Sequence, residues 1–178
     1  MASTEMFRVV SFGFRVDWGE PADHHENSKE TKPDDEPVAN GQELGAKNRM
    51  PYPTDLKYSK EHEWIKVEGS NATIGITDYA QEALGDIVFV ELPKPGSEIT
   101  AGKTFGTVES VKAVSDLFAP ASATVTAVNG ELATAPEKIN KDANHTWMIQ
   151  ATLKNPADLG ILLSAADYEK FISEEAGH

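Results

Sequence analysis

The feature that most constrains the fold of this chain is a run of short, β-branched and aromatic segments separated by turn residues. Residues 64–67 and 72–76 flank a Glu-Gly-Ser-Asn turn, a pattern typical of a β-hairpin. Residues 86–92 form the most strongly β-like segment, and a Pro-Lys-Pro-Gly stretch ends it. Further strands are expected at 103–109, 113–118, 123–128 and 146–153. Many short strands joined by close turns predict a small β-sandwich or a partly closed barrel.

Short helices are expected at the edges of this β core. Asp78 stands three residues before Gln81, which is the spacing of a capping box, and Gly85 follows as a helix-closing residue. These signals predict a helix over 78–84. Near the C-terminus, Ser164 has the spacing of an N-cap before a last helix.

The composition of the chain changes near residue 50. Residues 1–49 hold 10 acidic and 6 basic side chains, and most of this stretch has almost no large apolar residues. Such a sequence cannot bury enough surface to offset the entropy lost on ordering, so we expect a disordered N-terminal extension. The apolar run 7–16 is the exception, and we expect it to form a marginal strand or a weak docking segment. Residues 50–178 are long enough to bury a core and form the expected folded domain.

Charge and residue content exclude several classes of protein. Acidic side chains outnumber basic ones by 29 to 16, which disfavours binding to nucleic acid or to an anionic membrane surface. The chain contains no cysteine, so any thiol chemistry would have to arrive on an attached group. The stretch 23–26, Asp-His-His-Glu, lies in the segment expected to be disordered, and no catalytic constellation is visible. We therefore expect neither a metal site nor catalytic activity.

Lys112 is the residue best placed to take part in chemistry. The two segments that flank it have the pattern of paired strands, which would put the lysine at the exposed tip of a hairpin. Its neighbours Ser110, Val111 and Ala113 are small or medium in size and leave room for an enzyme to close over the tip. A lone lysine between strands is usually a solvated side chain, so this pattern alone does not decide its role.

Four segments keep the order and spacing of a known family. The string Val-Glu-Ser-Val-Lys-Ala-Val-Ser-Asp-Leu-Phe-Ala-Pro at 108–120 resembles the lipoyl-lysine segment of glycine cleavage system H proteins. Residues 57–64, 74–81 and 84–93 resemble other motifs of that family. The resemblance implies a mainly β barrel-sandwich hybrid of the lipoyl- and biotinyl-carrier kind, with short peripheral helices and a C-terminal helix.

The resemblance also implies a covalent cofactor. Lipoate would be attached to Lys112 through an amide, and the lipoate-attaching enzymes would recognise the residues around it, namely Glu109, Ser110, Val111 and Ala113. Glu63 and Asp116 are implied to line a cleft that holds the loaded arm, where a carboxylate beside an ammonium is a favourable contact. His62, next to Glu63, is interpreted as a hydrogen-bonded structural residue.

The function implied is that of a carrier, not an enzyme. The family member takes an aminomethyl group from the pyridoxal-phosphate glycine decarboxylase (P-protein) and presents it to the aminomethyltransferase (T-protein). The dihydrolipoyl dehydrogenase (L-protein) then reoxidises the arm. The acidic surface would favour partners with basic entrances. With no targeting signal visible, a bacterial cytoplasm is the expected location, and a mitochondrial matrix is the alternative.

Two alternatives and two departures from the family pattern stay open. The chain could be an H-like protein that relays lipoyl groups to other carriers, or another swinging-arm domain. Against a biotinyl domain, Val111 and Ala113 stand where methionines are usual.

Ala123 stands where many members of the family have glycine, which would cost about 1 kcal/mol if the position needs a positive φ. The loop 142–147 also differs from the usual Tyr-Gly-containing approach to the late tryptophan.

Overall fold

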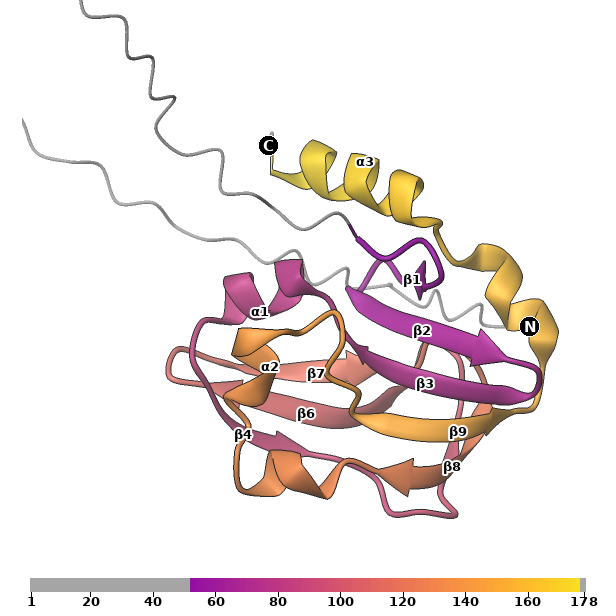
Figure 1. The fold of residues 1–178 in the computed structure, drawn as a ribbon, viewed down its shortest axis with the longest axis horizontal. Helices are drawn as coiled ribbons and strands as arrows, with labels where there is room; N and C mark the ends of the chain where they lie inside the picture. The colour runs from indigo at the N-terminus through magenta and orange to yellow at the C-terminus, as the bar shows by residue number, and fades with distance from the viewer. Residues whose placement is uncertain (1–51, 177–178) are drawn as a thin grey trace, which may run out of the picture. The chain divides into compact units, whose positions relative to one another are not determined.

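The computed structural model describes residues 52–176, which form two antiparallel β-sheets (Figure 1). The six-stranded sheet has the order β1-β2-β3-β9-β8-β5, and the three-stranded sheet has the order β4-β6-β7. The strands are β1 (Lys57–Tyr58), β2 (Glu63–Glu68), β3 (Asn71–Ile76), β4 (Ile87–Glu91), β5 (Glu98–Ile99), β6 (Thr104–Ser110), β7 (Val114–Phe118), β8 (Ala123–Val128) and β9 (Ile149–Leu153). The expected disorder of residues 1–49 and the apolar run within them lie outside the described residues.

The main core lies where the inward faces of the strands meet. Ile74 and Ile149 from the large sheet, and Val108 from the small one, are fully buried within it. Burying one such side chain is worth about 1.5–3 kcal/mol relative to leaving it exposed. Because both sheets contribute to one core, the small sheet is held in place against the large one.

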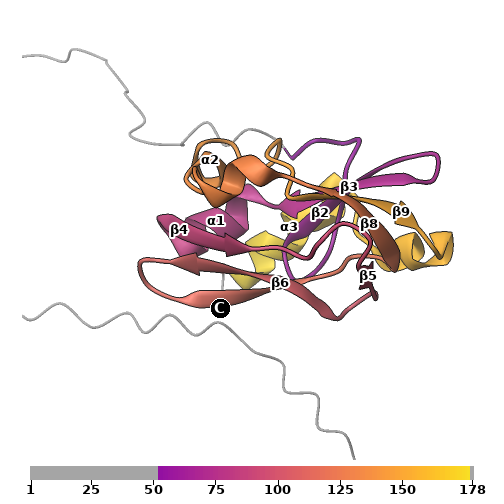
Figure 2. The ribbon, with the colours of Figure 1, turned by 90° about the horizontal axis from the view of Figure 1, so that it is seen from below.

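The helices are α1 (Asp78–Leu84), α2 (Lys138–Lys141) and α3 (Ala165–Glu175), with 3₁₀ helices at Gly130–Ala133 and Pro156–Ile161. The expected helix over 78–84 and the expected C-terminal helix are both present, whereas α2 and the 3₁₀ helix at Gly130–Ala133 were not expected. Ser164 caps α3, as predicted, by accepting a hydrogen bond from the backbone N–H of Asp167. Figures 1 and 2 show α1 and α2 at the same end of the described fold as the loop that joins β6 to β7.

The start of α1 differs from the expectation. Thr77, not Asp78, is the N-cap, because its side-chain oxygen accepts from the backbone N–H of Ala80 at 3.2 Å. Asp78 is the first helical residue, and its Oδ1 accepts from the side-chain amide of Gln81 at 2.8 Å. Gly85 closes the helix with φ of +78°, as its position predicted.

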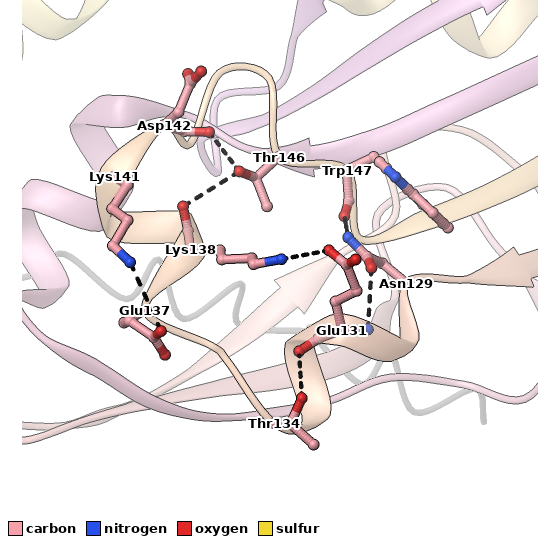
Figure 3. Close-up of polar contacts among 9 residues, drawn as sticks. All are labelled: Asn129, Glu131, Thr134, Glu137, Lys138, Lys141, Asp142, Thr146 and Trp147. Atoms are coloured by element: carbon pink, nitrogen blue, oxygen red, sulfur yellow. Dashed lines mark hydrogen bonds and ion pairs between the residues drawn. The ribbon is translucent and has the colours of Figure 1, made fainter.

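The late strand is shorter than expected, since β9 begins at residue 149 and not at 146. The preceding residues make a polar turn, in which the Thr146 hydroxyl donates to the backbone carbonyl of Asp142 at 2.6 Å and the Asn129 side-chain amide donates to the carbonyl of Trp147 at 2.8 Å (Figure 3). Ala123 does not have a positive φ, so the strain of about 1 kcal/mol considered for alanine at this position is absent. In the part of the chain that the structure describes, His62 is the one non-glycine residue with a positive φ. None of the helices between residues 52 and 176 is long and apolar enough to cross a membrane.

Candidate functional site

Strands β6 and β7 form the predicted hairpin, and Lys112 lies at its tip. The strands pair in antiparallel register down to Glu109 opposite Val114. The backbone N–H of Ser110 then donates to the carbonyl of Ala113 at 2.8 Å, which leaves Val111 and Lys112 as the two residues of the turn. The Lys112 side chain is exposed.

The Ser110 side chain shapes this turn. Its hydroxyl oxygen accepts from the backbone N–H groups of Lys112 at 3.2 Å and Ala113 at 3.1 Å. Serine commonly stabilises turns in this way, because a short hydroxyl side chain can satisfy amides that would otherwise lack a partner. Sequence reasoning assigned Ser110 only to recognition by a modifying enzyme and missed this local role, although serine at a turn was a sufficient signal.

The hairpin tip rests on the residues that follow α1. The backbone N–H of Val111 donates to the carbonyl of Asp86 at 3.0 Å. A Cβ atom added to Gly85 would lie 2.7 Å from Cε and 3.3 Å from Nζ of Lys112, so the lysine side chain passes over bare glycine backbone. The positive φ of Gly85 favours glycine, whereas the end of the flexible Lys112 side chain could move away from an added Cβ.

Exposed apolar side chains surround the tip. Val111 and Val114 in the hairpin are 67% and 65% exposed, and Val88 and Phe89 in β4 are 52% and 48% exposed. Phe89 pairs with Glu109, which pairs with Val114, so Phe89 and Val114 flank Glu109 on one face of the small sheet. Clustered apolar groups of this kind mark contact surfaces more often than isolated ones do.

Glu63 is buried, although it is a carboxylic acid. It is 1% exposed, and one carboxyl oxygen accepts from the backbone N–H of Phe118 at 2.8 Å while the other bonds the Ser59 hydroxyl. Burial raises the pKa of Glu63 to about 8, since the loss of hydration outweighs the hydrogen bonds that favour the charged form. Glu63 opens β2 and Phe118 ends β7, so this contact joins the two sheets.

Asp116, the second acid expected in the site, lies on β7 between the tip and this contact. Its side chain is exposed, and it pairs with Thr107, which in turn pairs with Glu91. At roughly 3.3 Å per residue, Asp116 is about 7 Å and Phe118 about 13 Å along the strand from Val114. A flexible group attached at the tip and folded back along β7 would therefore meet Asp116 first.

His62 has the structural role predicted for it. Its Nδ1 lies 2.8 Å from the Tyr168 hydroxyl, which also lies 2.8 Å from the Thr77 hydroxyl. Its Nε2 lies 3.4 Å from a carboxyl oxygen of Glu175 in α3. Burial lowers the pKa of His62 to about 4 and outweighs this nearby carboxyl group, so the ring is neutral at pH 7. The ring helps to hold α3 against the start of β2.

Two observations outside the hairpin concern other kinds of site. Between residues 52 and 176, no group of three or more His, Cys, Asp or Glu side chains gathers closely enough to hold a metal ion, and the stretch 23–26 lies outside this range. A cavity of about 230 Å³ is lined by residues that include Trp64, Lys66 and Trp147, and none of its lining residues belongs to the β6–β7 hairpin. Lys112 itself is exposed at the tip of the hairpin.

Comparison with known proteins gives consistent matches. A family model described as Glycine cleavage H-protein matches residues 56–175. The chain is 67% identical over 129 residues to the glycine cleavage system H protein of Koribacter versatilis, a match that covers 72% of this chain and 100% of that protein. It is 60% identical over 129 residues to the protein of the same name from Acidobacterium capsulatum, again over 72% of this chain and 100% of the relative.

A solved structure matches as well. The crystal structure of a glycine cleavage system H protein from Mycobacterium marinum superposes with a TM-score of 0.63 at 38% identity, covering 68% of this chain and 98% of that one. Together with the two antiparallel sheets, this match confirms the expected fold class, a mainly β barrel-sandwich hybrid with short helices and a C-terminal helix.

Proposed function

The chain belongs to the glycine cleavage H-protein family, and from that premise we propose that it is a non-catalytic lipoyl carrier whose attachment residue is Lys112. The observation that supports this most is the exposed primary amine of Lys112 at the tip of a two-stranded hairpin, with its side chain laid over the bare backbone of Gly85. The bacterial relatives favour a cytoplasmic location.

The residues around the tip fit an amide-linked arm. Amide formation would neutralise Lys112, so a long apolar chain can lie against the exposed valines at little electrostatic cost. When attached, lipoate supplies thiol–disulfide chemistry, which this cysteine-free chain has no residues to perform. Glu109, Ser110, Val111 and Ala113 would present the lysine to a lipoate-attaching enzyme.

In this role the chain carries an aminomethyl group between enzymes. It would receive the group from the P-protein, present it to the T-protein and be reoxidised by the L-protein. The tip gives these enzymes a surface to contact, since Val88, Phe89 and Val114 are exposed apolar residues beside the lysine. The surrounding acids Glu91, Glu109 and Asp116 favour partner surfaces that are apolar at the centre and basic at the rim.

Glu63 and Asp116 have different parts in the proposed cleft for the loaded arm. Asp116 is exposed on β7 and can contact the amine of the cargo directly. Glu63 is buried and already bonds Ser59 and Phe118, so a direct contact with the amine requires the groups that cover it to move. Without that change, Glu63 acts by fixing the end of β7.

The test is acylation in vitro by a lipoate-attaching enzyme, read by intact mass and fragment mapping. The wild-type chain is compared with Lys112→Arg, which keeps the charge but forms no lipoyl amide under these conditions. Lys103→Arg is the matched control, because Lys103 is also an exposed lysine next to β6. We expect one lipoyl increment on the wild type and on Lys103→Arg, and none on Lys112→Arg.

A second step tests the place of the chain in glycine cleavage. The lipoylated chain is mixed with P-, T- and L-proteins, and glycine-dependent reduction of NAD is followed. Dependence on the lipoylated form supports the carrier role. Modification of another lysine, or of none, would overturn the assignment of Lys112, and a lipoylated chain that fails to support glycine oxidation would favour lipoyl relay.

A further inference from the structure

The backbone beneath Lys112 is held by a residue far from it in the sequence. Asn140, in α2, donates from Nδ2 to the carbonyl of Gly85 at 2.8 Å and to Oε1 of Gln81 at 2.9 Å. Its Oδ1 accepts from the backbone N–H of Ile87 at 2.9 Å. One side-chain amide therefore bonds the backbone on both sides of Asp86.

This backbone is the same one that supports the hairpin tip. The carbonyl of Asp86 accepts from the N–H of Val111, and the Lys112 side chain passes over Gly85. Strand β4 also pairs with β6 as far as Ile87 opposite Ser110, so the direction of the tip depends on where residues 86 and 87 lie. Because Asn140 fixes the residues before and after Asp86, it also fixes where the turn is held.

Asn140 can do this because α2 is itself anchored. A helix of four residues has no stability of its own. Fully buried Ile139 holds α2 to the core, and the Thr146 hydroxyl lies 3.3 Å from the Lys138 carbonyl and 2.6 Å from that of Asp142 (Figure 3). The exposed Lys138–Glu131 ion pair in the same view adds little.

We propose that Asn140 is a positioning residue for the acylation of Lys112. Among the described residues its side-chain hydrogen bonds go to Gln81, Gly85 and Ile87 and not to Lys112, and it acts by holding residues 85–87, on which the tip rests. The inference rests on the proposed function, since it concerns the rate at which Lys112 is lipoylated. Loss of the Nδ2 donor leaves the Gly85 carbonyl without this partner and lets the tip take more orientations when the modifying enzyme closes over it.

The expected effect falls on turnover and not on binding. The apolar surface around the tip stays in place, so KM for the protein substrate is expected to stay within about twofold, whereas kcat for lipoyl transfer falls about tenfold through poorer orientation of the amine. The intrinsic reactivity of Lys112 towards a small reagent such as acetic anhydride is expected to stay unchanged, because the amine remains exposed.

The experiment compares Asn140→Asp with Asn129→Asp. Asn129 offers the same chemistry, as its Nδ2 donates to the Trp147 carbonyl at 2.8 Å and its Oδ1 accepts from the N–H of Glu131 at 3.2 Å (Figure 3). It has no hydrogen bond to residues 85–87 among those the structure describes. Each full-length variant is assayed for kcat and KM with a lipoate-attaching enzyme, for acetylation of Lys112 by mass spectrometry, and for thermal unfolding.

The proposal holds if Asn140→Asp lowers kcat about tenfold while Asn129→Asp, with a comparable loss of thermal stability, does not. Equal kcat values for the two variants would overturn it and leave Asn140 a purely structural residue. If Asn140→Asp does not fold, the neutral Asn140→Ser takes its place with the same expectation. Failure of the wild type to be lipoylated would instead show that the proposed function itself is wrong.

Discussion

Replacing Glu63 with glutamine tests whether burial raises the pKa of this carboxyl group and thereby makes the stability of the fold depend on pH. The carboxyl group is 1% exposed, and burial raises its pKa to about 8 from an ordinary value of 4.5. Between these two pH values the folded chain binds more protons at this site than the unfolded chain does. The free energy of unfolding therefore falls as the pH rises through this window, and nothing is lost below it.

The size of the effect follows from the width of the window. At 1.36 kcal/mol per pH unit, the 3.5-unit difference between 4.5 and about 8 corresponds to about 5 kcal/mol, an upper bound reached above pH 8. Glutamine stays neutral and keeps an oxygen for the N–H of Phe118 and a polar group for Ser59. The advantage of Glu63→Gln over the wild type is thus expected to grow from pH 5 to pH 8 and then to level off.

His62 changes the wild-type profile in the opposite direction. Its pKa is lowered from 6.5 to about 4, so its contribution to stability is lost as the pH falls through that range. The two slopes oppose each other between pH 4.5 and 6.5, and a steep loss from Glu63 is expected only between 6.5 and about 8. Because both proteins contain His62, its effect cancels in the difference between them.

The assay is urea unfolding at pH 5, 6, 7, 8 and 9, followed by tryptophan fluorescence, since Trp64 is buried in the fold. The difference in free energy of unfolding between variant and wild type is plotted against pH. If this difference changes by less than about 1 kcal/mol between pH 5 and pH 9, the pKa of Glu63 is raised by less than one unit and the reasoning is refuted. It would mean that the hydrogen bonds from Phe118 and Ser59 keep Glu63 ionised in spite of burial.

Two further substitutions test the hairpin tip. Gly85→Ala is expected to lower the free energy of unfolding by about 1 kcal/mol because φ is positive at this position. It is also expected to slow lipoylation by displacing the end of the Lys112 side chain. Unchanged urea unfolding would contradict the first expectation, and unchanged lipoylation the second. Phe89→Ser is expected to lower the free energy of unfolding by only about 1 kcal/mol, because the ring is half-exposed, but to raise KM for the T-protein reaction. Ile161→Ser is its control, because Ile161 is 78% exposed and lies outside the hairpin and β4, and equal KM values for the two variants would remove Phe89 from the partner surface.

The sequence predicted the longer strands, the hairpin and the position of Lys112 because those features depend on neighbouring residues, but it did not predict the two-residue strands β1 and β5. Alternation of apolar residues and turn signals extend over a few positions, and they located β6 and β7 closely. The burial of Glu63 could not be predicted in this way, because the N–H that it binds belongs to Phe118, 55 positions later. The contacts of Asn140 span 53 to 59 positions and depend on how the elements pack.

The contacts that are distant in the sequence explain how the tip can be both exposed and well positioned. An attachment residue must reach into other proteins, so its side chain can gain little from burial, and its position depends on how the backbone beneath it is held. Here the rigidity comes from outside the hairpin. Strand β4 pairs with β6 as far as Ser110, and Asp86 holds the turn. Asn140 holds the backbone around Asp86, and Glu63 holds the far end of β7. Substitutions at Asn140 or Glu63 are therefore expected to affect Lys112 through the geometry of the hairpin, although neither residue belongs to the hairpin.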